Sequence, residues 1–138
     1  MSFEGIFTDV NEALTEPSHV LNLKVKVSQY DLFLQHAIKF IHLETLQLPR
    51  LKLKELPIEI GYFQKLKVLI VNHNELENLP LSLSLLPELK RINLDHNKFK
   101  IMPECLLKIE SLEHLSIDEN PFSAEEKQRI MEIFPVWF

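Results

Sequence analysis

The 138-residue sequence predicts an α/β solenoid, in which short coils stack and share one parallel β-sheet. Two observations carry this prediction. Leucine occurs 25 times and glycine only 2 times, which indicates that one apolar element is repeated. Apolar residues and prolines also recur at a constant step of 23 residues. One coil of that length cannot bury its own apolar side chains, so neighbouring coils must stack on it.

Five repeats follow one another without insertion. Their first residues are Val20, Leu43, Leu66, Leu89 and Leu112. In each repeat the apolar residues at positions i, i+3 and i+5 suit a short strand whose inward side chains alternate. A proline then ends the extended leg, because it cannot donate a hydrogen bond to a sheet. These prolines are Pro57, Pro80 and Pro103.

The third repeat shows the full pattern. It carries leucine or valine at 66, 69 and 71, then Asn74, Leu76 and the Leu79-Pro80 step, and the segment Leu56 to Gly61 reads LPIEIG. The sequence therefore resembles the leucine-rich repeat proteins, and within them the 23-residue Leu-Pro-x-x-Ile-Gly type of intracellular and bacterial members. The resemblance covers Val20 to about Phe122. It implies a short right-handed horseshoe with a parallel concave sheet and helical turns on its convex side.

An asparagine stands where the later repeats leave their strands, at Asn74, Asn97 and Asn120. Its amide can bond to backbone groups of adjacent coils that the turn would otherwise leave buried and unpaired. The first two repeats have Ser28 and Leu51 in this slot. Serine can do part of this work and leucine cannot, so we expect the N-terminal half to be less regular.

Both ends of the stack need a cap. We expect an N-terminal helix, because Phe3, Phe7, Val10 and Leu14 have helical spacing before Pro17. At the other end Ser123 and Glu126 form a capping box that starts a helix. The residues expected to seal the last repeat are Ile130, Ile133, Phe134 and Trp137. The prediction is one domain, 1–138, comprising an N-terminal cap (1–19), five repeats (20–122) and a C-terminal cap helix with its tail (123–138).

Charge and composition exclude several classes of protein. Lys and Arg total 15 against 20 Asp and Glu, and this net charge of −5 argues against a nucleic-acid binder. The sequence contains no run of about 18 apolar residues, so it predicts no membrane helix. The start of the chain does not read as a secretory signal, and the single cysteine suits a reducing compartment, so we expect a cytoplasmic location.

The motifs of common enzymes are missing from the sequence. There is no Ser/His/Asp signature, phosphate loop, dinucleotide fingerprint or HExxH. Cys105 shares its repeat position with the polar residues Glu59 and Ser82, so we expect it to be partly exposed and without an activating partner. We therefore predict a protein that is not an enzyme and needs no cofactor.

The outward positions of the stacked strands form the predicted concave face, which is free of packing demands. Its N-terminal end is basic, its centre is apolar around Val68 and Ile70, and its C-terminal end is acidic. The face comprises Lys24, Lys26, Arg50, Val68, Ile70, Asn72, His73, Arg91, Asn93, Asp95, His96, His114, Ser116, Asp118 and Glu119. An apolar centre with a charged rim is typical of a protein-binding site. We predict a protein partner, no nucleic acid and no membrane, for a chain that is a monomer or a weak homodimer.

One alternative is a metal-binding or metal-dependent hydrolytic protein. His73 and His96 are 23 residues apart and Glu119 follows by the same step, so all three fall in one column of the sheet. Neighbouring strands are about 4.8 Å apart, and two imidazoles with a carboxylate at that spacing can hold zinc. The competing interpretation is that exposed positions of a sheet simply carry polar residues.

Overall fold

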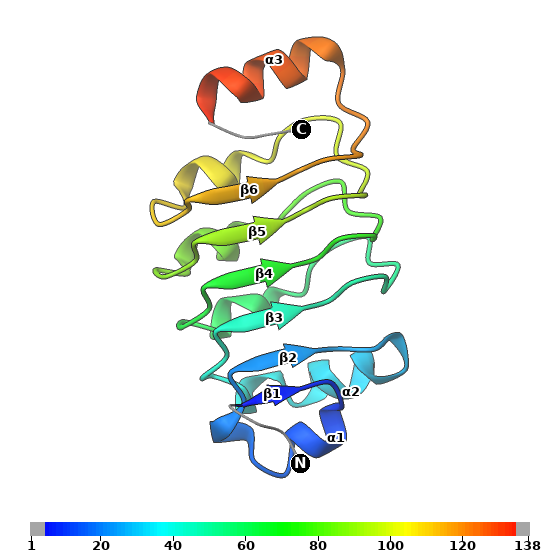
Figure 1. Ribbon diagram of the computed structural model, residues 1–138, viewed down its shortest axis with the longest axis vertical. Coiled ribbons are helices and arrows are strands. Elements are labelled where there is room, and N and C mark those ends of the chain that lie inside the picture. Colours follow the sequence, from blue (N-terminus) through cyan, green and yellow to red (C-terminus); the bar gives the residue numbers. More distant parts are fainter. Residues whose placement is uncertain (1–4, 135–138) are drawn as a thin grey trace.

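The computed structural model describes residues 5–134 as a parallel six-stranded sheet whose strands follow one another in chain order. The strands are β1 (Ile6–Phe7), β2 (Asn22–Lys24), β3 (Thr45–Gln47), β4 (Val68–Ile70), β5 (Arg91–Asn93) and β6 (His114–Ser116). In Figure 1 they rise one above another from the N-terminal to the C-terminal end, with α1 below β1 and α3 above β6. This open stack confirms the predicted solenoid.

The strand register follows the 23-residue step. From β2 to β6, each strand residue pairs with the residue 23 positions later, as Leu23 does with Leu46 and Leu69 with Ile92. The central residue of each of these strands is at most 5% exposed, and its two neighbours face outward. A period of two in a strand requires this alternation. The sheet therefore has one face in the core and one face free.

Short helical segments connect successive strands, and the last helix, α3, follows β6 and covers the end of the stack. They are α1 (Val10–Ala13), η1 (Pro17–His19), η2 (Val27–Gln29), α2 (Tyr30–Gln35), η3 (Ala37–Lys39), η4 (Ile58–Tyr62), η5 (Leu81–Leu85), η6 (Glu104–Lys108) and α3 (Ala124–Ile133). Pro57, Pro80 and Pro103 are the extended residues that precede η4, η5 and η6, as predicted for residues that end a strand leg. Within 5–134, no helix has the length and apolar content needed to cross a membrane.

The three asparagines join neighbouring coils. Asn97 donates from Nδ2 to the carbonyls of Leu94 (3.0 Å) in its own coil and Val71 (3.0 Å) in the coil before it. Its Oδ1 accepts from the backbone N–H of Leu76 at 3.1 Å. Asn74 and Asn120 make the equivalent bonds, and all three residues are at most 8% exposed. The role predicted for these amides is confirmed.

In the second to fifth repeats the residue before the asparagine slot has a left-handed backbone. Arg50, His73 and His96 have φ of 57°, and Glu119 has φ of 59°. Val27 holds this position in the first repeat, and a β-branched residue strongly disfavours that conformation. The chain instead enters η2 and then the helix α2, which makes the N-terminal half less regular, as expected.

The first two asparagine slots depart from the pattern in different ways. Ser28 lies exposed within η2, so the expectation that its hydroxyl replaces the amide is wrong. Leu51 is 7% exposed, and its backbone N–H donates to Oδ1 of Asn74 in the next coil at 2.9 Å. The second coil thus keeps its turn because its neighbour supplies the hydrogen bond.

The N-terminal segment differs from the predicted helix. Phe7 lies in β1, which pairs with β2, and α1 spans only Val10–Ala13, while Phe3 lies outside the described residues. Gly5 has φ of 75°, and its carbonyl accepts from the N–H groups of Leu21 (2.9 Å) and Asn22 (3.0 Å). The edge of a sheet offers unpaired backbone groups, and pairing with them outweighs a short match to helical spacing.

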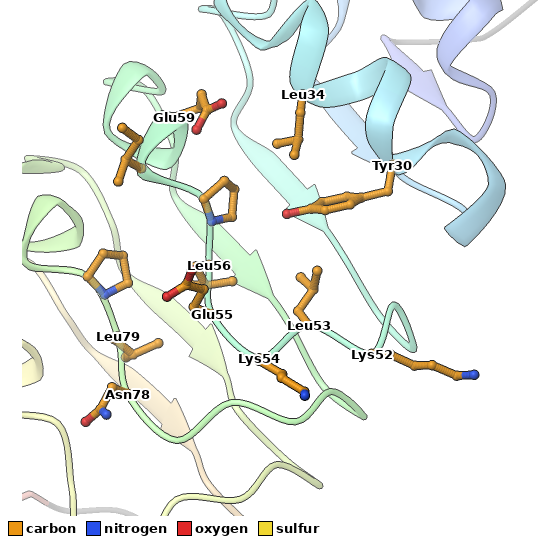
Figure 2. A pocket seen from close by; sticks show the side chains of 13 residues that line it. Tyr30, Leu34, Lys52, Leu53, Lys54, Glu55, Leu56, Glu59, Asn78 and Leu79 are labelled. Carbon is orange, nitrogen blue, oxygen red and sulfur yellow. The ribbon is translucent and has the colours of Figure 1, made fainter.

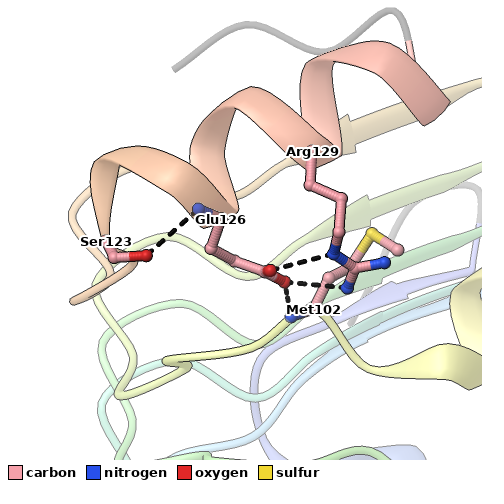
Figure 3. Close-up of polar contacts among 4 residues, drawn as sticks. All are labelled: Met102, Ser123, Glu126 and Arg129. Atoms are coloured by element: carbon pink, nitrogen blue, oxygen red, sulfur yellow. Dashed lines mark hydrogen bonds and ion pairs between the residues drawn. The ribbon is translucent and has the colours of Figure 1, made fainter.

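The C-terminal helix α3 begins as predicted. The Ser123 hydroxyl accepts from the N–H of Glu126 at 3.1 Å. Figure 3 shows that the Glu126 carboxylate does not complete the box; it accepts from the N–H of Met102 (2.8 Å) and from the guanidinium of Arg129 (2.9 Å). The Arg129 hydrogen bonds hold the pKa of Glu126 below its usual value. Glu126 therefore fastens the cap to the coil beneath it.

Not every residue expected to seal the last repeat does so. Ile130 is fully buried and Phe134 is half-buried against the core. Ile133 is 40% exposed, so its expected sealing role is wrong: it faces away from the side of α3 on which Ile130 and Phe134 pack against the core. Trp137 lies outside the described residues.

Candidate functional site

The outward residues of β2 to β6 form a face of aligned columns. One column runs Asn22, Thr45, Val68, Arg91, His114 and a second runs Lys24, Gln47, Ile70, Asn93, Ser116. The structure thus places the outward strand residues predicted for the concave face on one surface. Val68 and Ile70 lie on the middle strand and are half-buried, which makes them the apolar centre of this face.

The N-terminal end of the face holds a basic hollow of about 480 Å³. Lys24, Lys26 and Arg50 line it together with Gln47, and all three cationic side chains are exposed. Ile70 borders the same hollow, so the basic end joins the apolar centre directly. The structure therefore brings together the three cationic residues that were predicted for the N-terminal end of the face.

The C-terminal end of the face holds an acidic hollow of about 450 Å³. Asp95, Asp118 and Glu119 line it, with Lys127 of α3 at its border. Asp95 accepts from the Ser116 hydroxyl (2.6 Å) and from the N–H of Asp118 (2.8 Å), so its position is fixed. Burial raises the pKa of Asp118, and the charges of Asp95 and Glu119 raise it further.

Two histidines lie between the apolar centre and the acidic end. The rings of His73 and His96 stack with centroids 4.1 Å apart and planes 14° from parallel. Asn72 Nδ2 lies 2.8 Å from Nδ1 of His73. Because an amide nitrogen donates and does not accept, Nδ1 of His73 is the acceptor. Partial burial lowers the pKa of His73, and the charges of Arg50 and His96 lower it further.

The metal alternative does not fit this geometry. Parallel stacked rings set their nitrogens side by side, whereas zinc ligands must converge on one point. Within residues 5–134, no group of three or more His, Cys, Asp or Glu side chains has an arrangement that could hold a metal ion. This arrangement therefore does not support the alternative in which His73, His96 and Glu119 share a metal. The left-handed φ of both histidines gives their positions a structural explanation instead.

Cys105 corrects a second expectation. It is 2% exposed rather than partly exposed, because its repeat position is half-buried even where Glu59 and Ser82 occupy it. Burial raises the pKa of the thiol to about 11. A thiol so protonated and so inaccessible is a poor nucleophile.

The sequence did not predict a groove of about 680 Å³ that lies between α2 and the extended segments before η4 and η5. In Figure 2 Tyr30 and Leu34 of α2 point across it toward Leu53 and Leu56. Burial raises the pKa of Tyr30 to about 12. The groove exists because the first coil returns as a helix, and the only sequence signal for it is the helical spacing of Tyr30 and Leu34.

Apolar side chains on the convex side were also missed. Ile58 is 76% exposed, Leu81 66% and Leu85 68%. Ile58 and Leu81 share one repeat position on η4 and η5, so they lie on neighbouring coils. This convex pair is the chemical counterpart of Val68 and Ile70 on the concave face.

Comparison with known proteins decides the family. A family model described as "Leucine-rich repeat region" matches residues 15–133. The chain belongs to the leucine-rich repeat family. Among solved structures it is similar to a leucine-rich repeat protein of Leptospira interrogans, with 26% identity and a TM-score of 0.66 over 86% of this chain. The chain spans 30% of the length of that protein. The comparison with curated proteins found no match.

Proposed function

We propose that this leucine-rich repeat chain is a non-enzymatic protein-interaction module that binds a protein partner on its concave face. Leucine-rich repeat domains are generally protein-interaction modules. The observation that carries the proposal is the arrangement of the face: two apolar side chains, Val68 and Ile70, lie at its centre between a basic and an acidic hollow. Anchors of this kind inside a charged rim supply most of the affinity in protein interfaces.

The remaining parts of the proposal follow from the same chemistry. The buried and protonated Cys105 thiol lacks the activation that a catalytic nucleophile needs, which supports a role without an enzymatic activity or a cofactor. The net charge of −5 favours a protein partner over nucleic acid. A cytoplasmic location, the 23-residue Leu-Pro-x-x-Ile-Gly subtype and a single domain over 1–138 belong to this proposal as well.

Affinity capture with matched variants tests the concave face. The first variant carries Val68→Asp and Ile70→Asp, and the control carries Ile58→Asp and Leu81→Asp on the convex side. Each variant replaces two aliphatic side chains with two carboxylates. A difference in capture between the variants therefore depends on which face carries the change and not on the kind of substitution. We expect partners captured by the wild type to be lost with the concave variant and kept with the convex control. Retention by a folded concave variant, or loss with the convex control alone, contradicts the proposal.

A further inference from the structure

The charge of the concave face reverses about its middle strand. The basic hollow involves the coils of β2 and β3, and the acidic hollow involves the coils of β5 and β6. Between them β4 carries the apolar pair Val68 and Ile70 and is the third of these five strands. A surface with this polarity is complementary to a copy of itself turned end for end.

The two charged ends are too far apart to neutralise each other within one chain. Lys26 and Asp118 hold the same repeat position four strands apart, which is about 19 Å at about 4.8 Å per strand. That exceeds the Debye length of about 8 Å at physiological ionic strength. Among the described residues, the ion pairs Lys67–Glu44, Lys98–Glu75 and Arg129–Glu126 use none of the four charges Lys24, Lys26, Asp118 and Glu119. These charges therefore remain available to a partner.

We propose that the concave face binds a second copy of this chain, in a two-fold dimer whose axis runs parallel to the strands at β4. This inference rests on the proposed function, and it identifies the protein partner as a second copy of the same chain. Rotation about this axis keeps each column opposite itself and reverses the order of the strands, so β2 of one copy faces β6 of the other. Lys26 then meets Asp118 of the second copy, with Glu119 beside it. Val68 and Ile70 lie opposite their own counterparts across the axis.

The size of the face sets the strength of this dimer. The columns from Asn22 to Val27 span about 20 Å along the strands at about 3.3 Å per residue. With about 19 Å across the strands, each copy buries roughly 400 Å², or about 800 Å² for the pair, below the roughly 1,200 Å² of stable complexes. The dimer is therefore weak and reversible, and its charged ends make it sensitive to salt.

A trans-complementation experiment by sedimentation equilibrium tests the proposal. The acidic variant carries Lys24→Glu and Lys26→Glu; the basic variant carries Asp118→Lys and Glu119→Lys. Either variant alone brings like charges together at both ends of its dimer, so its self-association should weaken by at least about tenfold. In an equimolar mixture, opposite charges meet at both ends again. We expect the mixture to associate within a few-fold of the wild type.

Three results overturn the proposal: a wild type that stays monomeric up to millimolar concentration, a variant that dimerises like the wild type, or folded variants whose mixture associates no better than either one. Circular dichroism establishes that each variant is folded. If the half-buried Asp118 does not tolerate lysine, the exposed pair Lys26→Glu and Glu119→Lys repeats the same exchange. A monomeric wild type removes the second copy as the partner, whereas the capture experiment with Val68 and Ile70 decides separately whether the face binds any protein.

Discussion

The first coil and the later coils of this solenoid leave their strands differently. In the third coil His73 takes a left-handed backbone and Asn74 bonds to the coil before it. In the first coil Val27 and Ser28 hold the same two positions, and the chain turns into η2 and the helix α2. The comparison teaches that two adjacent positions decide whether a coil is regular: the first must tolerate positive φ, and the second needs a side-chain amide, either its own or, as at Leu51, that of the next coil.

The difference has consequences on both sides of the sheet. Because the first coil returns as a helix, Tyr30 and Leu34 reach over the legs of the next coils and create the groove of Figure 2. In the later coils the left-handed turn places His73 and His96 in one column, where their rings stack. Turn chemistry thus shapes surfaces that composition alone does not reveal.

The largest effect should come from the buried column of the regular coils. Leu94 is fully buried, and Leu94→Ala should cost about 2–5 kcal/mol of unfolding free energy, because it leaves a cavity between stacked coils. Lys90→Ala, at an exposed position of the same coil, should cost less than about 0.5 kcal/mol. Urea unfolding measures both. Equal losses, or a larger loss for Lys90→Ala, would show that the inward and outward positions are assigned wrongly.

The asparagine slot gives the sharpest version of the comparison, because Asn97 and Ser28 occupy one repeat position. Asn97→Ala leaves the buried Leu76 N–H without its acceptor, and it removes one of two amide donors from each of the Leu94 and Val71 carbonyls, to which Asn120 and Asn74 also donate. An unpaired buried group costs about 1–3 kcal/mol, so we expect a loss of at least about 1 kcal/mol. Ser28→Ala should change stability by less than about 0.5 kcal/mol, since Ser28 is exposed. Similar melting temperatures for the two variants would refute this account of the turns.

A smaller effect is expected where α3 meets the regular coils. Glu126→Gln removes the charge that binds Arg129 and Met102, and should cost about 1 kcal/mol at neutral pH. The folded pKa of Glu126 lies below its ordinary value of 4.5, so its contribution is present above pH 4.5 and is lost as the pH falls through the folded pKa. The difference between wild type and variant should therefore vanish in acid. A difference that persists there would mean that the charge is not its cause.

Much of the regular part could be predicted from the sequence. The 23-residue step predicted the pairing of Leu46 with Leu69, and the asparagine spacing predicted the bonds of Asn97. The predictions from sequence were wrong where the conformation or burial of a residue depends on contacts with segments distant in the sequence. The spacing around Phe7 suits a helix, but this segment pairs with the edge of β2 as strand β1. Cys105 occupies a repeat position that is polar in other coils, yet this position is half-buried in those coils and Cys105 itself is buried. The stacking of His73 on His96 was likewise invisible, because it depends on two left-handed turns.

The regular coils also present the proposed binding face, and isoleucine-methyl NMR tests that claim most directly. Ile70 lies at the centre of the concave face, and Ile58 is an exposed isoleucine on the convex side. Spectra are recorded as the protein is concentrated and as a captured partner is added. We predict that the Ile70 methyl signal shifts on binding while the Ile58 signal stays in place. A shift of Ile58 with an unchanged Ile70 would contradict the account and place the binding site on the convex side.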